Sequence, residues 1–253
     1  MTSGFKRVPA LDKCFDILDF LANSSKAPGI SEISKALGYH KSTVFNIVHT
    51  LVDLGVLERE PENKFRFGTR LYLLGKEAGN SSELIVTVHP YLEEINQTTK
   101  LSAFLGIRSG LRAIILDKVD SAFDIRISSE IGMRIPLLAG AGGKALLAQL
   151  SDGEVDEILS KNELKRFTPF SCVSKRKYKE MVGKAREEGI AVDREEYIEG
   201  IRALAVPIKI NRGDDPAAIW AVGLKRQLGD REMAKNSAYL KEIARKIEAR
   251  FAS

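Results

Sequence analysis

Residues 30–57 carry the clearest hydrophobic pattern in the chain. Apolar side chains recur there at three- and four-residue spacing in two segments, 30–37 and 41–54, with Gly38 between them. This spacing predicts two amphipathic helices joined by a tight turn, each with its apolar stripe against a core. A further amphipathic helix is predicted upstream, over residues 8–23, where it would pack beneath the pair.

The second helix of the pair has an exposed face that is small, polar and uncharged. Such a face can hydrogen-bond to base edges when a helix lies in the major groove of DNA. The pattern therefore predicts a helix-turn-helix, with Lys41 contacting a phosphate at the start of the second helix. The residues expected to set base specificity are Ser42, Thr43, Phe45 and Asn46.

Two strand-like runs, 57–60 and 64–67, follow that helix and are separated by a turn that contains proline and asparagine. They predict a β-hairpin, so the unit becomes a winged helix-turn-helix over residues 1–67. Lys64 and Arg66 would lie on or beside the wing, near phosphates or a minor groove. The alternative is a small helical subdomain with a solvated polar face. The order helix, turn, helix and basic hairpin favours DNA binding.

Residues 68–88 predict a connecting helix that ends before Pro90, with a domain boundary near residues 80–83. Beyond it, residues 89–253 contain both runs with the two-residue alternation of strands and runs with the helical spacing of three to four residues. This mixture indicates an α+β domain of the sensor type. Strands are predicted at 101–108, 111–119, 125–129, 190–193, 204–210 and 218–224, and helices at 142–150, 152–160, 178–188 and 230–251.

Composition narrows the function classes only slightly. The 253-residue chain is 44% hydrophobic and 29% charged, and its net charge of +5 permits nucleic-acid binding without requiring it. The two cysteines, Cys14 and Cys172, lie far apart, which suggests a reducing compartment. No signal peptide opens the chain and no apolar run approaches the ~18 residues that span a bilayer. We therefore expect a cytoplasmic protein that does not enter a membrane.

The segment 139–147 is the most chemically suggestive part of the C-terminal half. Its small residues, AGAGG, lead directly into a helix, where free backbone N–H groups favour a carboxylate or phosphate. A nucleotide P-loop is excluded because Leu138 and Ala145 stand where that motif needs Gly and Ser or Thr. The alternative is that the glycines serve only a turn or tight packing.

Enzyme chemistry finds little support. The three histidines fall in or beside the N-terminal domain without metal-ligand spacing, so we expect no metal and no cofactor. Asp193, Glu195 and Glu196 could provide general acid–base chemistry, but such a cluster is more often a solvated loop. No nucleophile motif accompanies it.

Four segments together resemble the IclR family of bacterial transcriptional regulators, over nearly the full length. They are ISEISKALGYHKSTVFNIVHTLVDLGVLER, FRFGTRLYLLG, GMRIPLLAGAGGKALLA and GIAVDREEYIEGIRALAVPI. The resemblance implies a winged-helix DNA-binding domain, a connecting helix and a GAF-like α+β effector-binding domain. It also implies homodimers, often paired into homotetramers, and effectors that are small organic or aromatic acids.

The resemblance also implies an effector site. Its members by position are Ile127, Ala141, Gly142, Asp193, Ala203, Gly223 and Lys225. The amides of Ala141 and Gly142 would bind the effector's carboxylate, which agrees with the helix-terminus argument. Ala203 stands where the family often has Cys. Lys225 stands where small hydroxyl residues are frequent in the family. It would either contact a second anionic group of the effector or point to solvent.

We therefore interpret the chain as an effector-responsive repressor or activator that binds double-stranded, palindromic operator DNA as a symmetric oligomer. In the recognition helix, Asn46 replaces an Arg that is common in the family, and Asn can pair with adenine. One alternative is a DNA-binding protein whose C-terminal domain only oligomerises. The other, a metabolic enzyme with an appended helix-turn-helix, lacks a catalytic constellation.

Overall fold

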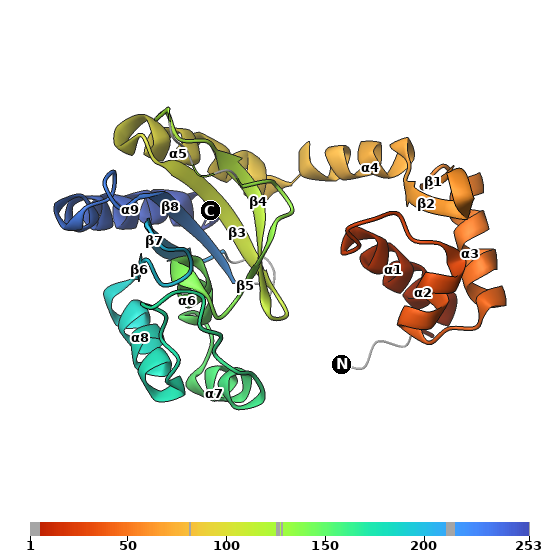
Figure 1. The fold of residues 1–253 in the computed structure, drawn as a ribbon. Coiled ribbons are helices and arrows are strands. Elements are labelled where there is room, and N and C mark those ends of the chain that lie inside the picture. Colours follow the sequence, from red (N-terminus) through yellow and green to blue (C-terminus); the bar gives the residue numbers. More distant parts are fainter. Residues whose placement is uncertain (1–5, 81, 125–126, 128, 211–215, 253) are drawn as a thin grey trace. The chain divides into compact units, whose positions relative to one another are not determined.

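The computed structural model of the chain is drawn in Figure 1. It describes residues 6–80, 82–124, 127, 129–210 and 216–252. The chain forms two compact units, Met1–Ser82 and Glu83–Ser253. Each unit has its own hydrophobic core and is described by itself.

The N-terminal unit is a helix-turn-helix followed by a hairpin. Its elements are α1 (Pro9–Ala22), α2 (Ile30–Leu37), α3 (Lys41–Asp53), β1 (Leu57–Glu60), a 3-10 turn (Pro61–Asn63), β2 (Lys64–Phe67) and α4 (Thr69–Asn80). Gly38 ends α2 with a φ of 69°, a left-handed conformation that glycine adopts without strain. The winged helix-turn-helix that the sequence predicts is confirmed.

The apolar stripes of α1, α2 and α3 meet the inner faces of the hairpin strands in one core. The buried residues of this core are Ile17, Leu21, Ile33, Val44, Val48, Leu51, Leu57 and Phe65. Because α3 buries Val44, Val48 and Leu51 at helical spacing, its opposite face turns to solvent. The core therefore fixes which side of α3 is presented to a partner.

The C-terminal unit is built on one six-stranded antiparallel sheet with the order β5-β4-β3-β8-β7-β6. Its strands are β3 (Ser102–Ser109), β4 (Arg112–Val119), β5 (Arg134–Pro136), β6 (Ala191–Arg194), β7 (Ile201–Ile208) and β8 (Ala217–Leu224). Its helices are α5 (Glu83–Thr99), α6 (Gly140–Leu147), α7 (Asp152–Lys161), α8 (Lys175–Glu188) and α9 (Asp230–Phe251). The α+β class is confirmed.

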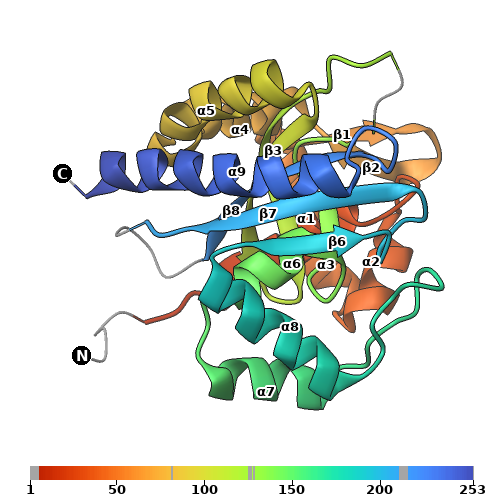
Figure 2. The same cartoon turned by 90° about the vertical axis from the view of Figure 1, so that its left-hand side faces the viewer.

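Helices cover both faces of this sheet. In Figure 2, α5 and α9 lie on one side of the strands and α6, α7 and α8 on the other. Two separate apolar cores correspond to these two sides. The core beneath α6 contains Phe104 and Trp220 from the central strands β3 and β8. The middle of the sheet therefore forms the floor of the α6 side.

One sequence prediction differs from the structure, and another lies largely outside the described residues. The helix expected over residues 68–88 is instead two helices, α4 and α5, and Pro90 lies inside α5 rather than beyond a helix end. The strand expected at 125–129 falls largely outside the described residues, and the third strand of this region is β5. No helix in the described part of the chain is both long and apolar enough to cross a membrane.

Candidate functional site

The recognition helix α3 presents the residues that the sequence assigned to DNA. Lys41, Ser42, Phe45 and Asn46 are exposed, and Thr43 is half-buried. The Phe45 ring packs against the imidazole of His49, with ring centroids 4.2 Å apart. The exposed face thus combines hydrogen-bonding groups with an aromatic surface, which suits base edges and thymine methyl groups.

The basic residues of the wing are paired with acidic neighbours. Lys64 Nζ donates to Glu32 Oε2 at 2.6 Å, and the Arg66 guanidinium lies 2.6 Å from Glu58 Oε2 and 3.5 Å from Glu60. Contact with a DNA phosphate therefore competes with these ion pairs. Within the described part of the chain Lys41 forms no ion pair of this kind, and it stands at the start of α3.

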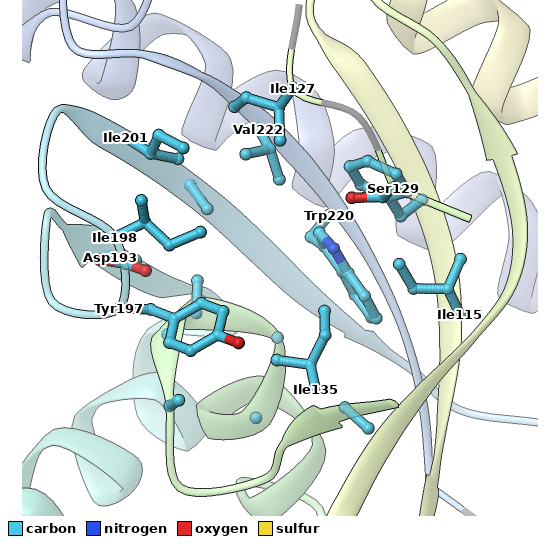
Figure 3. A pocket seen from close by; sticks show the side chains of 18 of the residues that line it. Ile115, Ile127, Ser129, Ile135, Asp193, Tyr197, Ile198, Ile201, Trp220 and Val222 are labelled. Atoms are coloured by element: carbon cyan, nitrogen blue, oxygen red, sulfur yellow. The ribbon is translucent and has the colours of Figure 1, made fainter. Parts of the chain in front are cut away.

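A cavity of about 110 Å³ lies between α6 and the middle of the sheet in the C-terminal unit. Its walls are mostly apolar. The lining residues are Phe104, Ala113, Ile115, Ile127, Ser129, Met133, Ile135, Ala139, Gly140, Ala141, Gly142, Gly143, Asp193, Tyr197, Ile198, Ile201, Ala203, Trp220 and Val222. Figure 3 shows Trp220 in the middle, with Asp193, Tyr197 and Ile198 on one side and Ile115 on the other.

Glycines bring the N-terminus of α6 against this cavity. Gly140 begins the helix with a φ of 69°, so the chain turns there in a conformation that disfavours other residues. A side chain on Gly143 would overlap the carbonyl oxygen of Leu137, and one on Gly142 would lie 3.3 Å from the Trp220 ring. The glycines therefore hold the first turn of α6 close to the segment that follows β5 and to β8. Its free N–H groups provide the cavity's positive end.

Asp193 lies beside that helix start and is only 4% exposed. Its Oδ2 is 3.0 Å from the position that a Cβ on Gly140 would occupy, and its Oδ1 accepts the backbone N–H of Glu196 at 2.6 Å. Burial raises the pKa of Asp193 to about 6, although this backbone hydrogen bond favours the charged form. A hydrogen-bond donor on a ligand would satisfy this carboxylate.

The structure separates the predicted effector residues into two groups. Ile127, Ala141, Gly142, Asp193 and Ala203 line the cavity, whereas Gly223 and Lys225 do not. The reason is the alternation of side chains along β8, where Trp220 and Val222 face the cavity. A side chain on Gly223 would instead meet Leu101 on the opposite face, and Lys225 Nζ lies 2.8 Å from Glu195 Oε1. These two residues therefore lie outside the cavity wall, and their role in effector binding stays a prediction.

Sequence reasoning missed several residues of the cavity wall. Trp220, Tyr197 and Ser129 come from a strand and from two loops whose positions a sequence pattern does not give. Trp220 offered the strongest signal, because it is the single tryptophan of the chain and stands in phase with Val222. Its ring is accommodated by Gly106 on β3, where a Cβ would overlap it.

The described residues provide no group of three or more His, Cys, Asp and Glu side chains that could hold a metal ion. A winged helix-turn-helix unit followed by an α+β unit with a lined cavity is the architecture of a one-component transcriptional regulator. A family model for the IclR helix-turn-helix domain matches residues 10–61, and one for the bacterial transcriptional regulator IclR C-terminal domain matches residues 77–249. The chain therefore belongs to the IclR family of transcriptional regulators, which are not enzymes.

Known proteins resemble the chain over almost its whole length. The HTH-type transcriptional regulator KdgR of Escherichia coli (strain K12) is 32% identical over 96% of this chain and 92% of its own. The crystal structure of the Thermotoga maritima IclR is 28% identical, with a TM-score of 0.70, over 98% of this chain and 100% of that one. An IclR homologue from Microbacterium hydrocarbonoxydans, crystallised with 4-hydroxybenzoate, shares the fold at 24% identity, with a TM-score of 0.78 over 96% and 100% of the two chains.

Proposed function

We propose that the chain is an effector-responsive regulator that binds operator DNA through α3 and the wing and binds a small carboxylic acid in the α6 cavity. It acts in the cytoplasm as a homodimer or homotetramer. The observation that carries the proposal is the cavity with the N-terminus of α6 at one end and apolar walls around the rest. Free N–H groups at a helix start bind a carboxylate, and apolar walls bind its hydrocarbon body.

The cavity favours one class of acid over another. Of the described residues that line it, those whose side chains carry polar atoms are Ser129, Asp193, Tyr197 and Trp220, whose indole can only donate. A polyhydroxylated acid would leave most of its hydroxyl groups unpaired, which costs free energy. A monocarboxylic acid with a flat or branched apolar body fits better, and a single hydroxyl or similar donor could reach Asp193. The 4-hydroxybenzoate bound to the Microbacterium homologue belongs to this class.

The effector changes transcription by favouring one arrangement of the DNA-binding units. A ligand that binds both arrangements equally shifts nothing, so the acid must have different affinities for them. The helices α4 and α5 link the cavity's unit to the DNA-binding unit in the chain and are the segments through which coupling passes.

The decisive experiment combines ligand binding with DNA binding. The fluorescence of Trp220, the only tryptophan, reports cavity occupancy while benzoate, 4-methylpentanoate, gluconate and neutral benzamide are titrated. Benzoate or 4-methylpentanoate should bind at least about tenfold more tightly than benzamide, since the amide lacks the charge that the helix terminus prefers. Gluconate should bind weakly.

The same acids are then added to a gel-shift assay on DNA from upstream of the protein's own gene. We expect the acid that binds most tightly to change DNA affinity by at least about fivefold, a coupling of about 1 kcal/mol. DNA binding that responds to none of the acids would favour a C-terminal domain that only oligomerises. Absence of DNA binding at low salt would refute the proposal.

A further inference from the structure

Residues 195–200, here called the mouth loop, connect β6 to β7 and form one wall of the α6 cavity. Tyr197 and Ile198 of this loop line the cavity, and Figure 3 shows their side chains beside Asp193. Ile198 is 45% exposed, so the loop reaches from the cavity to solvent. Movement of this loop would therefore open or close a route for a ligand.

The inner side of the mouth loop is fixed by buried contacts. Lys144 of α6 donates to both carboxylate oxygens of Glu196, at 2.7 and 2.9 Å, and the Lys144 side chain is only 2% exposed. The Thr168 hydroxyl donates to the carbonyl oxygen of Glu195 at 2.7 Å, and the Ser171 hydroxyl donates to that of Glu196 at 2.6 Å. Separating these groups would leave buried polar atoms unpaired, so this side is not expected to move.

The outer side of the mouth loop is held by the Glu195 carboxylate, which contacts Gly200 and Lys225. Glu195 adopts a φ of 68°, a left-handed conformation that is strained for any residue with a side chain. Its carboxylate is 8% exposed, and it accepts the Gly200 backbone N–H at 3.3 Å, which joins the two ends of the loop. Lys225 Nζ then lies 2.8 Å from Glu195 Oε1, while the Lys225 side chain is 56% exposed.

Lys225 also fixes the loop through its backbone, because its N–H donates to the Gly200 carbonyl oxygen at 2.7 Å. Its side-chain ion pair is the most solvent-accessible of these contacts, and such pairs are individually weak. A second cation is available when Lys225 moves away, since Arg202 Nε lies 3.7 Å from the same Glu195 oxygen. Glu195 therefore keeps a cationic partner whether or not Lys225 is in place. Breaking the ion pair between Lys225 and Glu195 consequently costs little free energy.

We propose that Lys225 is a latch that positions the mouth loop, and that release of its ion pair with Glu195 lets the effector enter and leave the α6 cavity. The role in effector exchange rests on the function proposed above for that cavity. Lys225 is a positioning residue in this scheme, because it acts on the cavity through Glu195 and does not line it.

Hydrogen–deuterium exchange of the full chain tests the latch without any effector. In Lys225→Met, amides of residues 197–200 should exchange at least about threefold faster than in the wild type, and Lys225→Arg should restore slow exchange, because the cation returns. The matched control is Lys179→Met, which removes a 2.7 Å ion pair with Asp156 between α7 and α8. Unchanged exchange of the mouth loop in Lys225→Met would overturn the latch.

Stopped-flow fluorescence of Trp220 tests the consequence for the ligand, with benzoate as the probe. Lys225→Met should raise the dissociation rate constant of benzoate by about fivefold. This factor corresponds to the upper end of the stabilising free energies of partly exposed ion pairs. Lys225→Arg should return it to the wild-type value, and Glu195→Gln combined with Lys225→Met should add nothing further. A dissociation rate unchanged in Lys225→Met would overturn the gating role. If benzoate and the other acids do not bind the wild type, the proposed function fails, and the exchange experiment alone decides the latch.

Discussion

Asp193 is a carboxyl group in a place where its charge is costly. Burial raises its pKa from an ordinary 3.8 to about 6, so the folded protein holds this proton more tightly than the unfolded chain does. The contribution of Asp193 to the free energy of unfolding is therefore highest below about pH 4. It falls as the pH rises to about 6 and stays low above that. The same charge lies beside the α6 terminus, where it opposes a bound carboxylate.

Asp193→Asn should therefore stabilise the protein at pH 8. We expect its free energy of unfolding to rise by about 1–3 kcal/mol, since one pKa unit corresponds to about 1.4 kcal/mol and the asparagine oxygen can still accept from Glu196. Urea unfolding at pH 8 and at pH 4 measures this, and the difference between variant and wild type should shrink at pH 4. Asp156→Asn, on an exposed residue, is the control. A variant less stable than the wild type at pH 8 would contradict this account.

Two glycines make a matched pair for testing backbone packing. A Cβ on Gly143 would overlap the Leu137 carbonyl oxygen, whereas a Cβ on Gly153 would meet nothing within 4 Å in helix α7. Gly143→Ala should destabilise the protein by about 3 kcal/mol or more. Gly153→Ala should stabilise it by about 0.5–1 kcal/mol, because alanine loses less conformational freedom in a helix. Thermal and urea unfolding measure both, and equal effects would contradict the packing argument.

At the scale of single residues, the sequence predicted the cavity only in part. The small residues before Lys144 pointed to a helix start that could bind an anion, and the structure places that start at the cavity. Gly223 lies outside the cavity wall because a shift of one residue along β8 turns a side chain to the other face of the sheet. Tyr197 and Ser129 could not be predicted, since no periodic pattern fixes the path of their loops.

At the scale of elements, hydrophobic periodicity gave most of the strands and helices, and Pro90 shows where it failed. A proline inside a helix removes a hydrogen bond and usually ends the helix. Here α5 continues through it because Val88, Leu92 and Ile95 are completely buried against the sheet and α9. Burial of those side chains outweighs the local cost of the proline. Such tertiary packing is not visible in a local pattern.

Ion pairing between elements affects the charge that the wing can offer to DNA. Lys64 on β2 is paired with Glu32 on α2, so its charge is partly neutralised before DNA arrives. Glu32→Gln should free this charge while the glutamine can still accept the Gly29 N–H, which Glu32 accepts at 2.6 Å. If Lys64 then contacts a phosphate, the slope of log affinity against log salt concentration should become more negative by about 0.9.

Fluorescence anisotropy with a mixed-sequence DNA duplex at several salt concentrations measures this slope. Glu180→Gln is the control, because its partner Arg176 lies on α8 in the other unit. Lys64→Ala combined with Glu32→Gln should cancel the gain. A slope that is the same in Glu32→Gln and in the wild type would show that Lys64 does not contact a phosphate.

At the scale of the whole molecule, symmetry decides how two recognition helices meet DNA. A regulator that reads two half-sites requires at least two copies of the chain. The helix α4 offers a surface for this purpose, since none of its described side chains is buried and Tyr72, Leu73 and Leu74 are each more than half exposed. Three adjacent apolar side chains of this size are unfavourable in water. A second copy of the chain would cover them in the proposed homodimer.

Leu74→Glu should therefore weaken the dimer, because burying a carboxylate in an apolar interface is costly. Sedimentation velocity should show a shift from about 56 kDa, twice the chain mass of 28.0 kDa, towards the monomer. Affinity for DNA with two half-sites should fall by about 100-fold or more, since the second half-site is no longer held nearby. Lys76→Glu, on the same helix, is the control for the added charge. A Leu74→Glu protein that remains a dimer with unchanged DNA affinity would show that α4 is not the surface through which the copies associate.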